Sequence, residues 1–326
     1  MQHFSRRAAG ISVAAAIALL AGTASAQQTL KFAHVYEVTE AFHDAALWAA
    51  DEIAKRTDGR YTMEVFPASS LGKETDINQG LTLGTVDIIY TGMNFAGRSY
   101  EPMTIASAPY MFRDIDHWMA YSKSDLWNEL KGGYEDATGH HVAAILYYGE
   151  RHVTSKFPIN TPEDMKGLKI RVPDAPLYVL FPKAVGANAT PIAFAEVYLA
   201  LQQGTVDAQE NPLPTIWAKK FYEPTPIIDL TGHITESLIT IVSGNLWNQL
   251  SDEDKATFDA VFAEASARSN EAILASEEDL LSKFKDAGAT INVVDRSLFR
   301  AVVEPYLTGD DMPWSQEQYD RLQAIE

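Results

Sequence analysis

The sequence of 326 residues contains no cysteine. This absence excludes disulfide scaffolds, thiol catalysis and cysteine-based zinc or iron–sulfur sites. Positive charge is also scarce, because 26 Lys+Arg stand against 44 Asp+Glu and give a formal net charge of −18. Nucleic-acid-binding surfaces are basic, so this acidity argues against a nucleic-acid partner.

Short motifs of catalytic and cofactor sites are also missing. The chain has no GxSxG elbow, P-loop, GxGxxG, HExxH or EF-hand loop. The eight histidines show no spacing typical of a metal site. Two carboxylates that hydrolyse a glycosidic bond can come from anywhere in a chain, so a secreted carbohydrate-active enzyme stays open as an alternative. We expect no metal, no cofactor and no catalysis.

Residues 1–26 have the pattern of an export signal. Arg6 and Arg7 precede an apolar run at 11–21, and residues 24–26 (ASA) have the small-x-small form that signal peptidase cleaves. A permanent membrane anchor, the alternative, needs about 20 apolar residues. Without Arg6 and Arg7 the mature chain has 24 basic against 44 acidic residues, a net charge of −20. We expect a periplasmic protein that begins near Gln27 and is monomeric.

Strand-like and helix-like runs alternate through the rest of the chain. The hydrophobic patterns predict strands at 29–35, 61–66, 86–90, 141–148, 168–172, 206–209, 237–243 and 289–294. They predict helices at 40–56, 74–83, 175–185, 193–202 and 251–287, followed by a helical tail. This alternation is typical of an α/β fold with a largely parallel sheet, and at about 150 residues per domain the length predicts two domains.

One segment is repeated within the chain. Residues 81–87 (LTLGTVD) recur as 201–207 (LQQGTVD), and each copy ends a predicted helix and enters a predicted strand. A glycine that ends a helix before a strand is common loop chemistry. Alternatively, the repeat marks two related lobes in which each loop meets a cleft between them, where ligands bind in open α/β sheets.

Two arginines lie in or just after predicted strands. Arg151 follows the strand at 141–148, and Arg171 alternates with apolar residues in 168–172. Each arginine could simply pair with an acidic side chain. Alternatively, each presents its guanidinium fork to an anionic ligand, since this fork matches a carboxylate bidentately.

Four strings, one of which contains Arg171, carry a family resemblance. They are 66–72 (FPASSLG), 162–173 (PEDMKGLKIRVP), 193–212 (AFAEVYLALQQGTVDAQENP) and 220–223 (KFYE). The chain resembles the solute-binding proteins of tripartite ATP-independent periplasmic (TRAP) transporters, the DctP-like family, over nearly its whole mature length. The resemblance implies a two-lobed α/β flytrap fold in which a long helix spans both lobes. We expect lobe I at 27–148 plus 237–276 and lobe II at 149–236 plus 277–326, with crossing segments near 148–151 and 236–240.

The resemblance also implies a binding site for an organic acid. In the family, the arginines that match Arg171 and Arg151 and the asparagine that matches Asn211 contact the ligand carboxylate. Glu74 matches an acid that holds ligand hydroxyls, and His34 ends the first strand, where the family often places a pocket side chain. Further expected lining residues are Tyr36, Tyr90, Asn94, Tyr148, Phe194 and Trp217, for each of which core packing is the alternative.

The expected ligand is a hexuronate or related sugar acid, delivered to the membrane permease subunits of the transporter. A C4-dicarboxylate or 2-oxo acid is the alternative within the family. Sialate-binding relatives carry an acid near the position of Gly92, and its absence here argues against sialate.

Overall fold

The computed structural model describes residues 27–309 and 311–326, so the predicted export signal lies outside the described residues. Nine strands form one sheet in the order β2-β1-β3-β8-β4-β7-β5-β6, and β9 pairs with β8. The strands are β1 (Gln28–Ala33), β2 (Tyr61–Phe66), β3 (Ile88–Gly92), β4 (His141–Ser155), β5 (Lys169–Val172), β6 (Asn188–Pro191), β7 (Ala208–Pro212), β8 (Ile227–Val242) and β9 (Thr290–Asn292).

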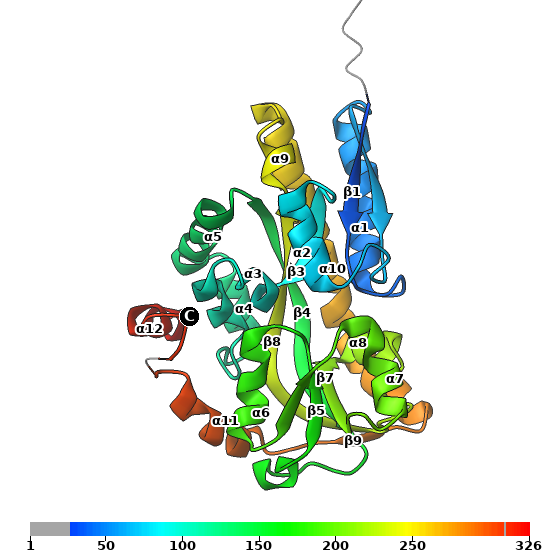
Figure 1. The fold of residues 1–326 in the computed structure, drawn as a ribbon, viewed down its shortest axis with the longest axis vertical. Helices are drawn as coiled ribbons and strands as arrows, with labels where there is room; N and C mark the ends of the chain where they lie inside the picture. Colours follow the sequence, from blue (N-terminus) through cyan, green and yellow to red (C-terminus); the bar gives the residue numbers. More distant parts are fainter. Residues whose placement is uncertain (1–26, 310) are drawn as a thin grey trace, which may run out of the picture.

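Helices cover both faces of this sheet (Figure 1). The α-helices are α1 (Ala41–Arg56), α2 (Glu74–Leu83), α3 (Met93–Ala96), α4 (Ile115–Tyr121), α5 (Asp125–Thr138), α6 (Leu180–Ala184), α7 (Val197–Gln202), α8 (Leu213–Ala218), α9 (Gly244–Trp247), α10 (Asp252–Asp286), α11 (Arg296–Val303) and α12 (Gln316–Gln323). Five 3-10 helices are η1 (Glu101–Ser107), η2 (Pro162–Met165), η3 (Pro176–Val179), η4 (Phe194–Glu196) and η5 (Glu304–Tyr306). Within the described part of the chain, no helix has the length and apolarity needed to cross a membrane.

The long strands β4 and β8 connect the two ends of the sheet. They pair antiparallel from His141 opposite Val242 to Ser155 opposite Ile227. β1, β2 and β3 lie at one end and β5, β6 and β7 at the other (Figure 1). The prediction of a largely parallel sheet holds within each end, but β4 and β8 run antiparallel to each other and to β7 and β3 respectively. The reason is topological, because the chain passes from one end of the sheet to the other along β4 and returns along β8.

The two expected crossing segments lie beside each other in this pairing. Gly149 is opposite Glu236, and β-bulges interrupt the ladder between Tyr147 and Gly149 and between Arg151 and Val153. Bulges bend a strand locally and increase its twist. The lobe boundaries themselves stay a prediction.

The long helix α10 joins two hydrophobic cores. Ser251 caps it by accepting a hydrogen bond from the amide of Asp254, as the sequence predicts, and acids fill its first turn. Phe258 and Phe262 of α10 belong to the larger core, whereas Leu280 and Phe284 belong to a second core built from α7, α8 and β8. α10 packs along α1, β4, α8 and β9 and so runs past both ends of the sheet (Figure 1).

The repeated segments build matching turns. Gly84 and Gly204 both have φ of 71°, which favours glycine, and they lead into β3 and β7. The expectation that these loops meet the cleft is wrong, since neither segment lines the pocket described below. The pocket is instead lined from the opposite ends of the two strands, by Gly92 and Asn211.

Candidate functional site

A pocket lies where β3, β5 and β7 end and where α2 begins. Its empty space, counted together with the open solvent at its mouth, is about 510 Å³. Its lining residues are Val35, Tyr36, Lys73, Glu74, Thr75, Gly92, Phe95, Tyr148, Arg151, Arg171, Pro173, Asp174, Tyr178, Ala193, Phe194 and Asn211. Seven of the eleven predicted site residues therefore come together here.

Arg171 presents an unpaired cationic group to this pocket. The residue is 2% exposed, and its Nε and Nη2 both donate to the carbonyl of Ile192, at 2.9 and 2.7 Å. Nη1 is buried and has no hydrogen-bond partner among the described residues. Burial lowers the pKa of Arg171 to about 10, which still leaves it positively charged at neutral pH. The carbonyl fixes one side of the guanidinium and leaves the other side for an anion.

Arg151 is held by protein carboxylates instead. Its Nε and Nη2 donate to the two carboxylate oxygens of Glu210, and Nη2 also donates to the Glu210 carbonyl at 2.8 Å. Glu236 Oε2 lies 3.7 Å from Nη1. Burial alone would raise the pKa of Glu210, but Arg151 and His233 outweigh it and hold that pKa at about 2. This carboxylate is therefore ionised at neutral pH and is paired with Arg151.

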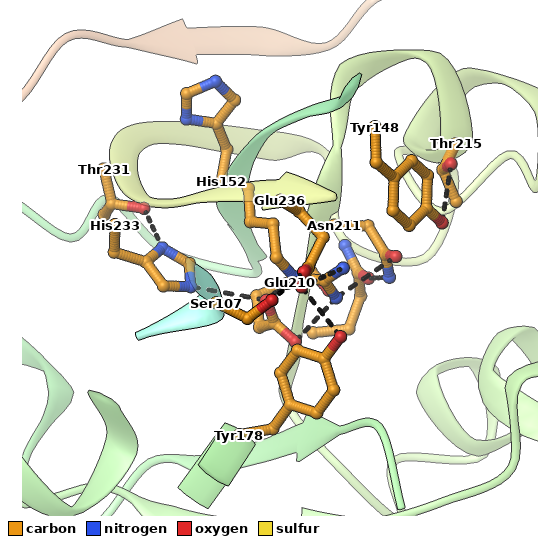
Figure 2. Close-up of polar contacts among 12 residues, drawn as sticks. Ser107, Tyr148, His152, Tyr178, Glu210, Asn211, Thr215, Thr231, His233 and Glu236 are labelled. Carbon is orange, nitrogen blue, oxygen red and sulfur yellow. Dashed lines mark hydrogen bonds and ion pairs between the residues drawn. The ribbon is translucent and has the colours of Figure 1, made fainter. Parts of the chain in front are cut away.

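Glu236 anchors the other side of the cluster. Ser107 donates to its Oε1 at 2.5 Å, and Tyr178 donates to its Oε2 at 2.7 Å (Figure 2). The Tyr178 ring also lies 5.1 Å from the Arg151 guanidinium carbon, a cation–π contact. These contacts fix Arg151 and Tyr178 beside the pocket.

Asn211 is oriented within β7 by two polar neighbours. Its Oδ1 accepts from Arg151 Nη2 at 3.3 Å, and its Nδ2 donates to Gln209 Oε1 at 2.5 Å. β7 pairs with β4 so that Asn211 stands opposite His152 and next to Arg151 across the ladder. The string at 193–212 thus lies beside the chain segment that carries Arg151.

Glu74 supplies a carboxylate at the start of α2. Its Oε1 accepts hydrogen bonds from the amide of Gly92 at 2.7 Å and from the hydroxyl of Thr91 at 2.9 Å. Burial raises its pKa to about 7, and the nearby Glu236 adds to this, whereas Arg171 opposes it. The second oxygen, Oε2, forms no hydrogen bond within the described chain.

Aromatic rings form one wall of the pocket. The Tyr36 ring lies 5.2 Å from that of Tyr148 and 6.2 Å from that of Phe194. Tyr148 Oη lies 3.1 Å from Thr215 Oγ1 (Figure 2). Thr215 Oγ1 donates to Glu40 at 2.5 Å. Such rings suit the apolar face of a sugar.

Four predicted residues lie outside the lining. His34 Nε2 is 3.2 Å from His43 Nδ1, and the Tyr90 ring packs edge-on against Phe32 at 4.7 Å. Asn94 is buried at the start of α3, and Trp217 stacks on Tyr222 at 5.2 Å.

Sequence reasoning missed three members of the polar cluster. Glu210 directly precedes Asn211 in the quoted string, so the signal for it was present. Tyr178 and Glu236 carry no local signal, because only the tertiary fold places them beside Arg151. No group of three or more His, Cys, Asp or Glu able to hold a metal occurs in the described ranges.

Two α/β ends joined by crossing strands, with buried arginines in the pocket between them, define a solute-binding protein. A family model described as "Bacterial extracellular solute-binding protein, family 7" matches residues 32–309. The chain belongs to this family, and the resemblance to TRAP solute-binding proteins is confirmed.

Two curated relatives match nearly the whole chain. A solute-binding protein of Roseobacter denitrificans is 33% identical over 298 residues, covering 90% of this chain and 91% of the relative. The sialic acid-binding periplasmic protein SiaP of Vibrio cholerae is 32% identical over 315 residues, covering 97% and 98%.

Solved TRAP periplasmic solute-binding proteins share the fold. One from Roseobacter denitrificans with bound L-galactonate has a TM-score of 0.86 at 30% identity, covering 92% of this chain and 98% of that one. One from Polaromonas bound to D-erythronate has a TM-score of 0.88 at 30% identity, covering 92% and 99%. One from Sulfurospirillum deleyianum with bound succinate has a TM-score of 0.86 at 27% identity, covering 92% and 99%.

Proposed function

We propose that this protein captures a hexuronate or related sugar acid and delivers it to the membrane permease of a TRAP transporter. The observation that carries this proposal is the buried guanidinium of Arg171, whose Nη1 has no partner among the described residues. A buried cation is expensive to leave unpaired, and a ligand carboxylate supplies the missing charge and hydrogen bond. Asn211 lies in the same pocket as a second polar contact.

Glu74 and the aromatic wall favour a hydroxylated acid. Glu74 Oε2 can accept a hydrogen bond from a ligand hydroxyl in either protonation state, whereas a second ligand carboxylate could bond to Glu74 only while Glu74 is protonated, and its pKa of about 7 leaves it partly ionised at neutral pH. Tyr36, Tyr148 and Phe194 suit a compact polyol chain or sugar ring. The L-galactonate and D-erythronate bound by the two structural neighbours support the same class of ligand.

A C4-dicarboxylate or 2-oxo acid is the second candidate. Lys73 also lines the pocket and offers a cation for a second carboxylate, and the Sulfurospirillum neighbour holds succinate. We do not propose sialate, because Gly92 stands where sialate-binding relatives carry an acid. A Cβ at this position would lie 3.3 Å from Tyr178 Oη, so the glycine leaves that part of the pocket open.

The proposal also includes the export and the location of the protein. Residues 1–26 direct export to the periplasm, where the mature monomer binds its ligand and meets the permease. The receptor returns the ligand chemically unchanged, which separates it from the alternative of a carbohydrate-active enzyme.

A thermal-shift screen tests the proposal. The panel contains D-galacturonate, L-galactonate, D-erythronate, succinate and pyruvate. A ligand at 100 times its dissociation constant adds ~2.7 kcal/mol to the stability of the native state, a clear rise in melting temperature. A rise with a hydroxy acid supports the proposal, and its NMR spectrum should be unaltered after incubation. A rise with succinate or pyruvate alone supports the second candidate, and no rise with any acid contradicts both.

A further inference from the structure

Thr75 places a hydroxyl group without a partner at the pocket. It is the second residue of α2, it lines the pocket, and its Oγ1 is buried without a hydrogen-bond partner in the described chain. A threonine further along a helix commonly donates to the carbonyl three or four residues earlier, as Thr138 does to Tyr134 at 2.8 Å. Thr75 lies in the first turn, where the residues at those positions, Gly72 and Leu71, precede the helix, so no helical carbonyl satisfies its hydroxyl.

The same pocket contains a second buried polar atom without a partner. Arg171 Nη1 comes from β5, whereas Thr75 Oγ1 comes from α2 beside β3. A buried polar group without a hydrogen-bond partner destabilises a protein, so each of the two atoms calls for an explanation. A single ligand that bonds to both groups explains both.

The start of α2 is fixed against β3, which fixes the backbone that carries Thr75. Asn78 Nδ2 donates to the Glu74 carbonyl and to Thr91 Oγ1, each at 2.8 Å. Thr91 and Gly92 in turn donate to the Glu74 side chain. A contact group carried on a backbone that is fixed in this way needs little rearrangement when a ligand binds.

We propose that Thr75 Oγ1 bonds a hydroxyl of the captured acid and makes this site select hydroxy acids over acids without that hydroxyl. The inference rests on the proposed function, in which Arg171 holds the ligand carboxylate. A threonine hydroxyl is one donor and an acceptor, and an ionised carboxylate only accepts. A ligand hydroxyl can therefore accept a hydrogen bond from Thr75 and donate one to the neighbouring Glu74. An ionised ligand carboxylate has no proton, so it cannot donate a hydrogen bond to Glu74.

Three variants and two ligands test this assignment by calorimetry. Thr75→Val removes the hydroxyl and keeps the side-chain shape, Thr75→Ser keeps the hydroxyl, and Thr82→Val is a control on the exposed part of the same helix. The ligands are the tightest-binding hydroxy acid of the panel and succinate. We expect Thr75→Val to weaken hydroxy-acid binding ~10-fold relative to succinate, since a lost hydrogen bond to a positioned group is worth about a factor of ten. Thr75→Ser and Thr82→Val should stay within ~3-fold of the wild type.

The outcomes distinguish a failure of the Thr75 assignment from a failure of the proposed organic-acid binding. If Arg171→Ala abolishes hydroxy-acid binding but Thr75→Val binds as the wild type does, the Thr75 assignment is overturned alone. Equal weakening of both ligands by Thr75→Val also overturns it, because selectivity would then not depend on the hydroxyl. If the wild type binds no acid of the panel, the proposed function fails together with the inference.

Discussion

Arg151 and Glu210 form a closed pair, in which Nε and Nη2 of the arginine bond both carboxylate oxygens of the glutamate. Arg171 in the same pocket has no carboxylate partner among the described residues and bonds only the carbonyl of Ile192. The two arginines therefore have different expected roles. Arg151 is a positioning group within a protein network, and Arg171 is the group available to an anion.

The first prediction concerns ligand affinity. Loss of a charged contact in a desolvated cleft costs on the order of 2–5 kcal/mol, so Arg171→Ala should weaken binding of the preferred acid by ~30-fold or more. Arg171→Lys should also lose affinity, because a point charge cannot reproduce the guanidinium fork. Calorimetry measures both, with Arg321→Ala on the surface as the matched control. Wild-type affinity in Arg171→Ala would remove this residue from the site.

The second prediction concerns stability. Arg151→Met leaves the buried Glu210 and Glu236 without their cation, and breaking a buried pair in this way costs about 3–5 kcal/mol. Denaturant unfolding should show this loss for Arg151→Met and a much smaller one for Arg171→Ala. The double variant Arg151→Met/Glu210→Gln should recover part of the stability. Equal unfolding midpoints for Arg151→Met and the wild type would contradict the assigned role.

The sequence predicted most of the fold because its periodic patterns are local. The strand Tyr61–Phe66, the helix Glu74–Leu83 and the capped helix beginning after Ser251 all appear where expected. Helices α4 and α5 were not predicted, although Asp114 and Ser124 cap them in the usual way. The antiparallel course of β8 was missed because its first half, with the polar residues Asp229, Thr231 and His233, does not read as an apolar strand.

The candidate site was predictable only in part, for a similar reason. Residues inside long quoted strings, such as Arg171 and Asn211, could be named from sequence. Glu236 and Tyr178 could not, because their importance comes from distances that the tertiary fold creates. Conversely, Trp217 and Tyr90 looked suitable for a pocket, yet they pack against Phe284 and Phe32.

The third prediction concerns release of the ligand. Lys219 Nζ lies 2.6 Å from Glu37 Oε1 and also 5.1 Å from the Phe194 ring, so it ties the segment beside Tyr36 to the segment beside Phe194. A partly exposed pair of this kind contributes up to about 1 kcal/mol. Lys219→Met should therefore speed ligand dissociation by roughly 2–5-fold in stopped-flow tryptophan fluorescence.

The neighbouring Lys220 provides the control for this experiment. It is 64% exposed and pairs with Glu223 at 3.7 Å within its own segment, so Lys220→Met should release ligand at the wild-type rate. Identical rates of ligand dissociation in Lys219→Met and Lys220→Met would show that the Lys219–Glu37 pair does not slow ligand release.

The fourth prediction concerns pH. Burial raises the pKa of Glu40 from 4.5 to about 7, despite hydrogen bonds from Thr215 and the Glu37 amide. Between pH 4.5 and pH 7, Glu40 is protonated in the folded state and ionised in the unfolded state. The free energy of unfolding that Glu40 contributes therefore falls as the pH rises through this range. The shift corresponds to roughly 3 kcal/mol at most.

Glu40→Gln tests this origin directly, because the amide cannot ionise. Unfolding free energies measured between pH 5 and pH 7.5 should decline less in the variant than in the wild type. Parallel pH profiles would mean that Glu40 does not contribute to the dependence.

The central claim is that Arg171 holds the carboxylate of an organic acid in the pocket between β3, β5 and β7. A crystal structure with the tightest-binding acid of the screen tests it most directly. The account predicts a carboxylate oxygen within hydrogen-bond distance, about 3 Å, of Arg171 Nη1, with the Arg151–Glu210 pair intact. A ligand carboxylate bound elsewhere, or one that displaces Glu210 from Arg151 and leaves Nη1 without a partner, would contradict it.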